Sequence, residues 1–261
     1  MTVFPGVQAP ATAGVPREAR PFARHSLSGH LRLLENEVQI AALLFMGFVY
    51  AFRLLWIFKF KSRRERTFGV GSQAAGVGYS MMNVMMPWAM ESTRKRPWFY
   101  AQFAVFHLGV IAAIAATFII PYAPGVFEIK AVVRSFQIVL GAACMVGILR
   151  LARRLKNPAV RLISTVDDYL SLLLMIAFFA GGVLAVPNNY RKAEWPLMIF
   201  FGLTAFFLVY VPFSKICHYL YYPFTRYYLG RSQGHRGTFP PGRPADGGGP
   251  GPGRRGQGNQ G

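Results

Sequence analysis

The sequence predicts an all-α integral membrane protein, built as a bundle of five transmembrane helices. Of its 261 residues, 53% are hydrophobic and 15% aromatic, and the mean hydropathy is +0.30; this composition is too apolar for an ordinary soluble domain. Five stretches are long enough to cross a hydrocarbon layer roughly 30 Å thick. These predicted spans are about Val38–Phe58, Phe99–Tyr122, Val132–Leu149, Tyr169–Val186 and Pro196–Leu220.

The spans divide the chain into three parts. Residues 1–35 are rich in proline and arginine and lack a compact apolar core ending at a small-residue cleavage site, so no cleavable signal peptide is expected. Residues 36–228 form the predicted membrane domain. Residues 229–261 are rich in glycine, proline and arginine and cannot bury enough apolar surface to fold, so we expect a disordered tail.

The connection from Lys59 to Pro97 contains two unusual stretches. Residues 69–78 are rich in glycine but lack the GK[ST] ending of a phosphate-binding loop, so a flexible linker is expected. Methionines recur through residues 81–90, just before the basic residues 94–96. This second stretch indicates either a segment lying in the membrane interface or a docking surface for a partner.

The distribution of basic residues predicts the orientation in the membrane. Lys and Arg gather in the first connection, in the third connection (Arg150–Arg161) and in the C-terminal tail, and they are fewer on the other side. The positive-inside rule therefore places residues 1–35 outside and the C-terminus in the cytoplasm. This topology, with attraction to anionic headgroups of the lipid bilayer, accounts for the formal net charge of +19, so no nucleic acid partner is expected.

His107 and His218 are the histidines inside the apolar spans, and an ionisable side chain in hydrocarbon is a candidate functional residue. With a rise of about 1.5 Å per residue, His107 lies about 13 Å from the cytoplasmic surface. His218 lies about 12 Å from it if the helix continues through Pro223. Two neutral imidazoles at one depth are the usual axial ligands of the iron of a b-type haem. The alternative is that each histidine hydrogen-bonds a neighbouring helix.

Basic side chains near that depth are candidates for binding the haem propionates. Arg53 lies toward the inner end of the first span and Arg226 follows the last, and Arg94–Arg96 and Lys215 lie at similar levels. For each of them the alternative is a side chain that snorkels to the interface and helps to set the topology.

Asp167 and Asp168 follow Ser164 and Thr165 at the cytoplasmic start of the fourth span. Carboxylates at a helix N-terminus cap free amides and interact favourably with the helix dipole. The alternative is that one of them, with Lys215 or Tyr219, handles the proton coupled to quinone reduction.

Three phrases carry a resemblance to a known family. They are FHLG at Phe106–Gly109, VDDYLSLLLMIAFFAGG at Val166–Gly182 and VPFSKICHYLYYPFTRY at Val211–Tyr227. They resemble the gamma, cytochrome b, subunit of respiratory nitrate reductase, and the resemblance covers roughly residues 36–228. The stretch PWAMESTRKRPWFYAQFAVFHLG looks more like relatives in heterodisulfide-reductase-like and quinone-interacting sulfur-metabolism complexes.

The resemblance implies a function and a location. It implies that His107 and His218 ligate haem, that quinone or quinol is the substrate, and that a cytoplasmic iron–sulfur or flavoprotein subunit exchanges electrons with the haem. The chain would then be the electron-transfer and quinone-reactive subunit of an oxidoreductase complex, a multi-pass protein of a bacterial or archaeal inner membrane.

The sequence also departs from the nitrate reductase pattern, which has a second pair of histidine ligands nearer the outer face. At the corresponding positions this chain has Thr117 in the second span and Phe200 and Phe201 in the fifth. None of these side chains is a haem ligand, so one haem b is expected. A cofactor-free membrane scaffold or a small transporter subunit is the alternative function; the absence of a visible internal repeat argues against a transporter.

Overall fold

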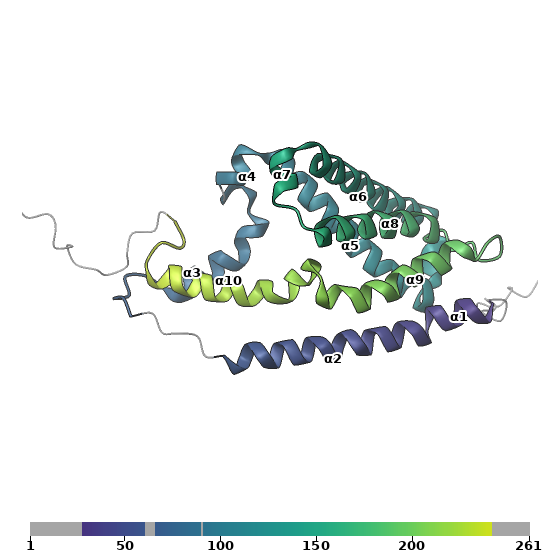
Figure 1. Ribbon diagram of the computed structural model, residues 1–261, viewed down its shortest axis with the longest axis horizontal. Helices are drawn as coiled ribbons and strands as arrows, with labels where there is room; N and C mark the ends of the chain where they lie inside the picture. The colour runs from purple at the N-terminus through teal and green to yellow at the C-terminus, as the bar shows by residue number, and fades with distance from the viewer. Residues whose placement is uncertain (1–27, 61–65, 90, 242–261) are drawn as a thin grey trace, which may run out of the picture.

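The computed structural model describes residues 28–60, 66–89 and 91–241, and the regular secondary structure in that part of the chain is helical (Figure 1). Among these described residues, five helices are long and apolar enough to cross a membrane. They cover Gly29–Lys59, Pro97–Tyr122, Lys130–Lys156, Val166–Ala185 and Trp195–Phe213. The predicted all-α architecture with five candidate spans is therefore confirmed, whereas the predictions for residues 1–27 and 242–261 lie outside the described residues.

Ten α-helices make up the described part of the chain, with short 3₁₀ turns between several of them. Their bounds are α1 Gly29–Glu35, α2 Glu37–Lys59, α3 Gln73–Met82, α4 Glu91–Lys95, α5 Pro97–Tyr122, α6 Lys130–Lys156, α7 Pro158–Leu162, α8 Val166–Ala185, α9 Trp195–Tyr210 and α10 His218–His235. Proline stands in the first turn of α5, α7 and α9, where its fixed φ suits a helix start and its missing N–H costs nothing.

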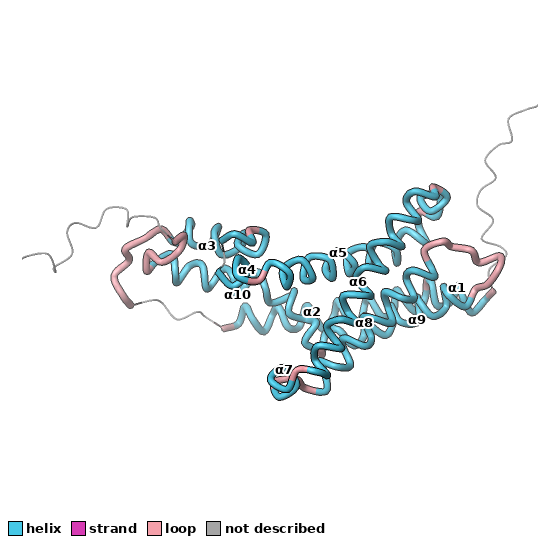
Figure 2. The backbone as a smooth tube through the Cα atoms, turned by 90° about the horizontal axis from the view of Figure 1, so that it is seen from above, coloured by secondary structure: helices cyan, strands magenta, loops and turns pink. Residues whose placement is uncertain are grey.

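The spans pack in the order α5, α6, α8, α9, α2, which makes an arc with α5 and α2 at its two edges (Figures 1 and 2). Large aromatic rings fill the centre of the arc: Phe179 and Phe200 are fully buried, and Phe178 stacks on Phe200 with ring centroids 5.2 Å apart. We call the end of the arc where α2 and α6 finish and α5 and α8 begin the basic end, because Lys59, Arg94–Arg96 and Arg150–Lys156 lie there.

The outer surface of the arc is apolar. Leu44, Phe48 and Leu55 on α2 are 70%, 74% and 70% exposed, and comparable side chains cover the outside of α5, α6 and α8. A water-soluble protein rarely exposes so large an apolar surface. Since every span is a helix that satisfies its own backbone hydrogen bonds, this surface suits a lipid bilayer.

The predicted fifth span, 196–220, is wrong as one continuous helix. Helix α9 ends at Tyr210, and two 3₁₀ turns, Val211–Phe213 and Lys215–Cys217, precede α10. Pro212 lacks a backbone N–H, and Ser214 between the turns is extended, with its side chain accepting from the Ile216 amide. His218 is therefore the first residue of a separate helix.

Two expectations of disorder are also wrong. Helix α10 continues to His235 and packs antiparallel against α3, although both segments were expected to be flexible. Glycine allows this close packing, because Gly76, Gly230 and Gly234 lie where the two helix backbones are in direct contact and any side chain would separate them. The ordered part of the chain thus extends through residues 229–241, and the glycine-rich stretch is helical from Gln73 onward.

Substituting Gly76 by Ala should loosen α3 from α10. A Cβ there would lie 2.5 Å from the Cα of Gly234 and closer still to the Gly230 carbonyl oxygen. Overpacking of this kind costs about 1–3 kcal/mol, so amide hydrogen exchange in α3 should accelerate by about tenfold or more. The matched control is Gly78→Ala in the same helix, where a Cβ meets nothing within 4 Å. Equal exchange rates in the two variants would contradict the close packing.

At the opposite end of the arc, Ser28 is tied to the loop before α9. The Ser28 amide donates to Glu194 Oε1 at 3.0 Å, and Ser28 Oγ accepts from the Leu31 amide at 3.3 Å as the cap of α1. Hydrogen bonds from the Ser28 side chain and backbone lower the pKa of Glu194 from its ordinary value of 4.5. The ionised carboxylate therefore helps to fasten the start of α1.

This contact should weaken in acid. Because the folded-state pKa of Glu194 is lowered, its stabilisation is fully present above the ordinary value of 4.5 and is lost as the pH falls through the lowered value. Hydrogen exchange at the Ser28–Leu31 amides, corrected for intrinsic rates, should lose protection in that range. The Glu194→Gln variant keeps an acceptor without titrating, so its profile should be flat; a wild-type profile equally flat would contradict the assignment.

Candidate cofactor site

His107 lies in the first half of α5 and is partly buried. Its Nδ1 is 2.8 Å from the Phe103 carbonyl oxygen one turn earlier in the same helix. Its ring also packs on the Phe103 ring, with centroids 4.1 Å apart, and lies 6.3 Å from that of Phe106. The hydrogen bond and the two rings hold the imidazole in one orientation.

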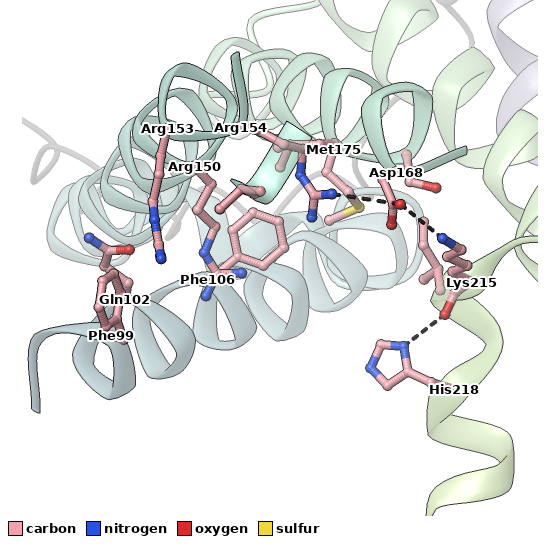
Figure 3. Close-up of a pocket in the computed structure, with 14 residues that line it drawn as sticks. Phe99, Gln102, Phe106, Arg150, Arg153, Arg154, Asp168, Met175, Lys215 and His218 are labelled. Atoms are coloured by element: carbon pink, nitrogen blue, oxygen red, sulfur yellow. Dashed lines mark hydrogen bonds and ion pairs between the residues drawn. The ribbon is translucent and has the colours of Figure 1, made fainter. Parts of the chain in front are cut away.

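His218 is the first residue of α10. Its Nδ1 is 3.0 Å from the Lys215 carbonyl oxygen, and the ring is exposed, extending from α10 toward α5 (Figure 3). The 3₁₀ turn Lys215–Cys217 makes this bond possible, because it turns the Lys215 carbonyl toward the ring.

The two histidines share one hydrogen-bonding pattern. A carbonyl oxygen only accepts, so in both rings Nδ1 carries a proton, and in the neutral form of the ring Nε2 has the lone pair. Metal-bound histidines are typically fixed in this way, with the second nitrogen donating to a main-chain or carboxylate oxygen. Both bonds stay within the histidine's own segment of chain, so these contacts give no support to the alternative that each ring bonds a neighbouring helix.

A cavity of about 510 Å³ opens beside His218 at the basic end, within the usual size range of small-molecule and cofactor sites. Its walls come from α5, α6, α7, α8 and the break before α10. The lining side chains that the site uses are Phe99, Gln102, Phe106, Arg150, Arg153, Arg154, Asp168, Met175, Lys215 and His218. His107 is not among the lining residues, but its ring lies 6.3 Å from that of Phe106, which is one of them.

Three arginines from the last turns of α6 lie along one wall (Figure 3). The Arg150 guanidinium lies over the Phe106 ring at 5.0 Å, and Arg153 lies over Phe99 at 4.2 Å. Arg154 instead donates to Ser164 Oγ at 2.7 Å and lies 3.6 Å from Asp168. Sequence reasoning assigned all three to topology; the spacing 150, 153, 154, which places them on one helix face, was the available signal for a shared site.

The carboxylates Asp167 and Asp168 connect α8 to the break before α10. Thr165 and Asp168 form a capping box, which supports the capping interpretation. Asp168 also accepts from Lys215 Nζ at 2.8 Å, and Asp167 accepts from the Lys215 amide at 3.1 Å and from Tyr210 OH at 2.5 Å. Through Lys215 these bonds set the position of His218. A role in proton transfer stays a prediction.

The other predicted site residues lie apart from the cavity. Arg53 donates to Tyr221 OH at 2.8 Å, and the Arg226 guanidinium lies 5.2 Å from the Tyr222 ring of its own helix. Tyr219 shares a hydrogen bond with Tyr50 of α2. Of the cations and proton donors considered from the sequence, Lys215 lines the cavity, whereas Arg53, Arg226 and Tyr219 do not.

A haem would need fewer ligands from the protein than a bare metal ion. In the described part of the chain, no group of three or more His, Cys, Asp or Glu side chains could hold a metal ion. A haem supplies four iron ligands itself and needs only one or two from the protein. Histidines with a free Nε2, an adjoining cavity and basic side chains in its wall are compatible with that requirement.

Comparisons with known proteins leave the family open. No family model matches the chain, and no solved structure matches it. It is similar to a protein of Nitratidesulfovibrio vulgaris, with 26% identity over 159 residues, which cover 59% of this chain and 70% of that protein. The name of that relative, "Protein", states no function.

Replacing Asp168 by Ala should destabilise the basic end. The variant loses a helix cap and a partly buried charge-assisted hydrogen bond, each worth about 1–2 kcal/mol. Thermal unfolding in detergent should therefore move to lower temperature by several degrees. The control is Glu91→Ala, which removes an exposed ion pair to Lys95 worth at most about 0.5 kcal/mol. If both variants unfolded at the wild-type temperature, the network around Lys215 would not stabilise the fold.

Proposed function

We propose that the chain is a membrane cytochrome b subunit that binds one haem b through His107 and His218. The observation that carries the proposal is the shared histidine geometry: in both rings Nδ1 is engaged by a main-chain carbonyl, which leaves Nε2 free as a ligand. The cavity beside His218 and the aromatic rings around His107 support it.

When bound, the haem supplies reversible one-electron chemistry, and the protein supplies orientation and electrostatics. The Phe103 and Lys215 carbonyls would hold the two imidazoles as neutral ligands. Asp167 and Asp168 would keep Lys215, and hence His218, in place. Phe99 and Phe106 would exclude water from one wall of the cavity.

The proposed orientation places the basic end in the cytoplasm. The positive-inside rule favours this arrangement because Lys and Arg gather at that end. The apolar outer surface supports a multi-pass position in a bilayer, for which we propose the inner membrane of a bacterium or archaeon.

In this function the subunit carries electrons between the quinone pool and a cytoplasmic iron–sulfur or flavoprotein partner. The resemblance to the nitrate reductase gamma subunit supports it, as does the site at the basic end, which would lie near the cytoplasmic surface. Asp167, Asp168 and Lys215 line or adjoin the cavity, whereas Tyr219 lies outside it, so we propose the former three for proton exchange with quinone. If the purified protein is colourless and therefore lacks haem, the alternative function, a cofactor-free membrane scaffold, is supported instead.

Replacing either His107 or His218 by Ala should abolish haem binding while the protein still inserts, because the apolar spans do not depend on the cofactor. Pyridine haemochrome analysis of the purified variants measures the loss. His30→Ala, at an exposed position of α1, is the matched control and should keep the wild-type haem content. Full haem content in either membrane variant would remove that histidine as a ligand.

The partner should dock on the basic end, through the connection Lys59–Pro97 and the turn Arg150–Arg161. Arg94 and Arg96 are exposed there, and a positive surface speeds association with an acidic partner. Reversing both to Glu should slow haem reduction by the partner about tenfold or more at low salt, without changing the haem spectrum. The control reverses Arg191 and Lys192 in the loop at the other end. If stopped-flow showed that the two double reversals slow haem reduction equally, the partner would not dock on the basic end.

A further inference from the structure

We propose that Arg150 and Arg153 form an oxyanion site that binds the carboxylate groups of the cofactor. This inference rests on the proposed function and deepens it, since it assigns to α6 the role that the sequence suggested for Arg53 and Arg226. A pair of guanidinium groups binds an oxyanion, and that oxyanion could come from either of two sources: the carboxylates of the cofactor or the phosphate of a membrane lipid.

Neither arginine has a carboxylate partner within the described residues. Arg154, the third member of the group, pairs with Asp168, and Asp168 also binds Lys215. That carboxylate is therefore shared by two other cations, and neither Arg150 nor Arg153 contacts it. Both cations therefore line the cavity without a carboxylate partner among the described residues, Arg150 half-buried and Arg153 exposed; a charge that is partly removed from water without a partner is costly.

The aromatic rings hold both guanidinium groups in a defined position. Arg150 lies over Phe106 and Arg153 over Phe99, and both phenylalanines belong to α5 across the cavity (Figure 3). Stacking on a ring occupies the face of a guanidinium and leaves the N–H donors at its edge. Those donors match the two oxygens of a carboxylate in bidentate geometry. The Gln102 amide in the same wall adds a neutral donor.

The position of the pair favours the cofactor as the source of the oxyanion. Arg150 and Arg153 line the same cavity as His218, which stands at its other side (Figure 3). A haem held by His218 would carry its carboxylates on one edge of the ring, away from the iron. Cations that bind those carboxylates should therefore lie at a distance from the iron ligand, as Arg150 and Arg153 do. The dipole at the end of α6 also favours cations, but it does not explain why Arg150 and Arg153 line the cavity whereas Lys156, at the same helix end, does not.

The test compares haem b with its dimethyl ester, which lacks the two charges. Full-length apoprotein, produced under haem-limited growth, is titrated optically with each compound. Wild type should bind haem b about ten- to a hundredfold more tightly than the ester, as expected for charge-assisted hydrogen bonds. The double variant Arg150→Gln/Arg153→Gln should lose that preference, with unchanged affinity for the ester. Lys156→Gln, which removes an exposed charge from the same helix end, should behave as wild type.

Each other outcome overturns the assignment in a distinguishable way. Equal affinity of wild type and the double variant for haem b would show that the arginines do not bind the carboxylates. If phosphorus analysis found less bound phospholipid in the double variant while haem affinity stayed constant, the oxyanion would be a lipid phosphate. If wild type bound neither haem compound, the proposed function itself would fail, and this inference with it.

Discussion

The position of His218 depends on how the chain is held where α9 breaks. Pro212 ends the hydrogen-bond ladder of α9, and two 3₁₀ turns follow before α10 begins. Such a break inside a membrane bundle needs partners for its free backbone groups. Asp167 and Asp168 at the start of α8 supply them, because one binds the Lys215 amide and the other its ammonium group. The Lys215 carbonyl is thereby left directed at His218.

This arrangement gives one network two functions. The residues that cap α8 also bind Lys215 in the connection before α10. The carboxylates therefore have a structural role that does not depend on any part in catalysis. The same connection lines a cavity whose opposite wall carries the arginines of α6 and the aromatic rings of α5. Fold and candidate site are thus built from the same contacts, and a change that loosens the network should disturb both.

The length and hydropathy of the spans were predictable, because burial in lipid needs an uninterrupted apolar run. The break at 211–217 was not predicted, although Pro212, Ser214 and Lys215 interrupt the apolar run there, because a transmembrane helix also tolerates a proline and a lysine can snorkel to the interface. The pairing of α3 with α10 was missed for a different reason. Glycine composition indicates flexibility, but Gly76, Gly230 and Gly234 act through backbone contact between segments far apart in the sequence.

The candidate site was predictable in part. A histidine in an apolar span is conspicuous, so His107 and His218 could be selected from sequence, although their role as ligands stays a prediction. Charge counting did not separate the cavity arginines from those that set topology, because it does not use their spacing, which places Arg150, Arg153 and Arg154 on one helix face. Arg53 and Arg226 were chosen by depth alone, and each has instead an aromatic residue as its neighbour.

The most direct test of the central claim is the haem content and spectrum of the purified wild-type protein. One low-spin haem b per chain, with the reduced spectrum and the electron paramagnetic resonance signal of bis-imidazole ligation, is the result that the account predicts. Thr117 donates to its own helix and Phe200 is fully buried, so neither position leaves a ligand for a second haem. A colourless protein free of iron would contradict the account, and two haems per chain would contradict its assignment of ligands.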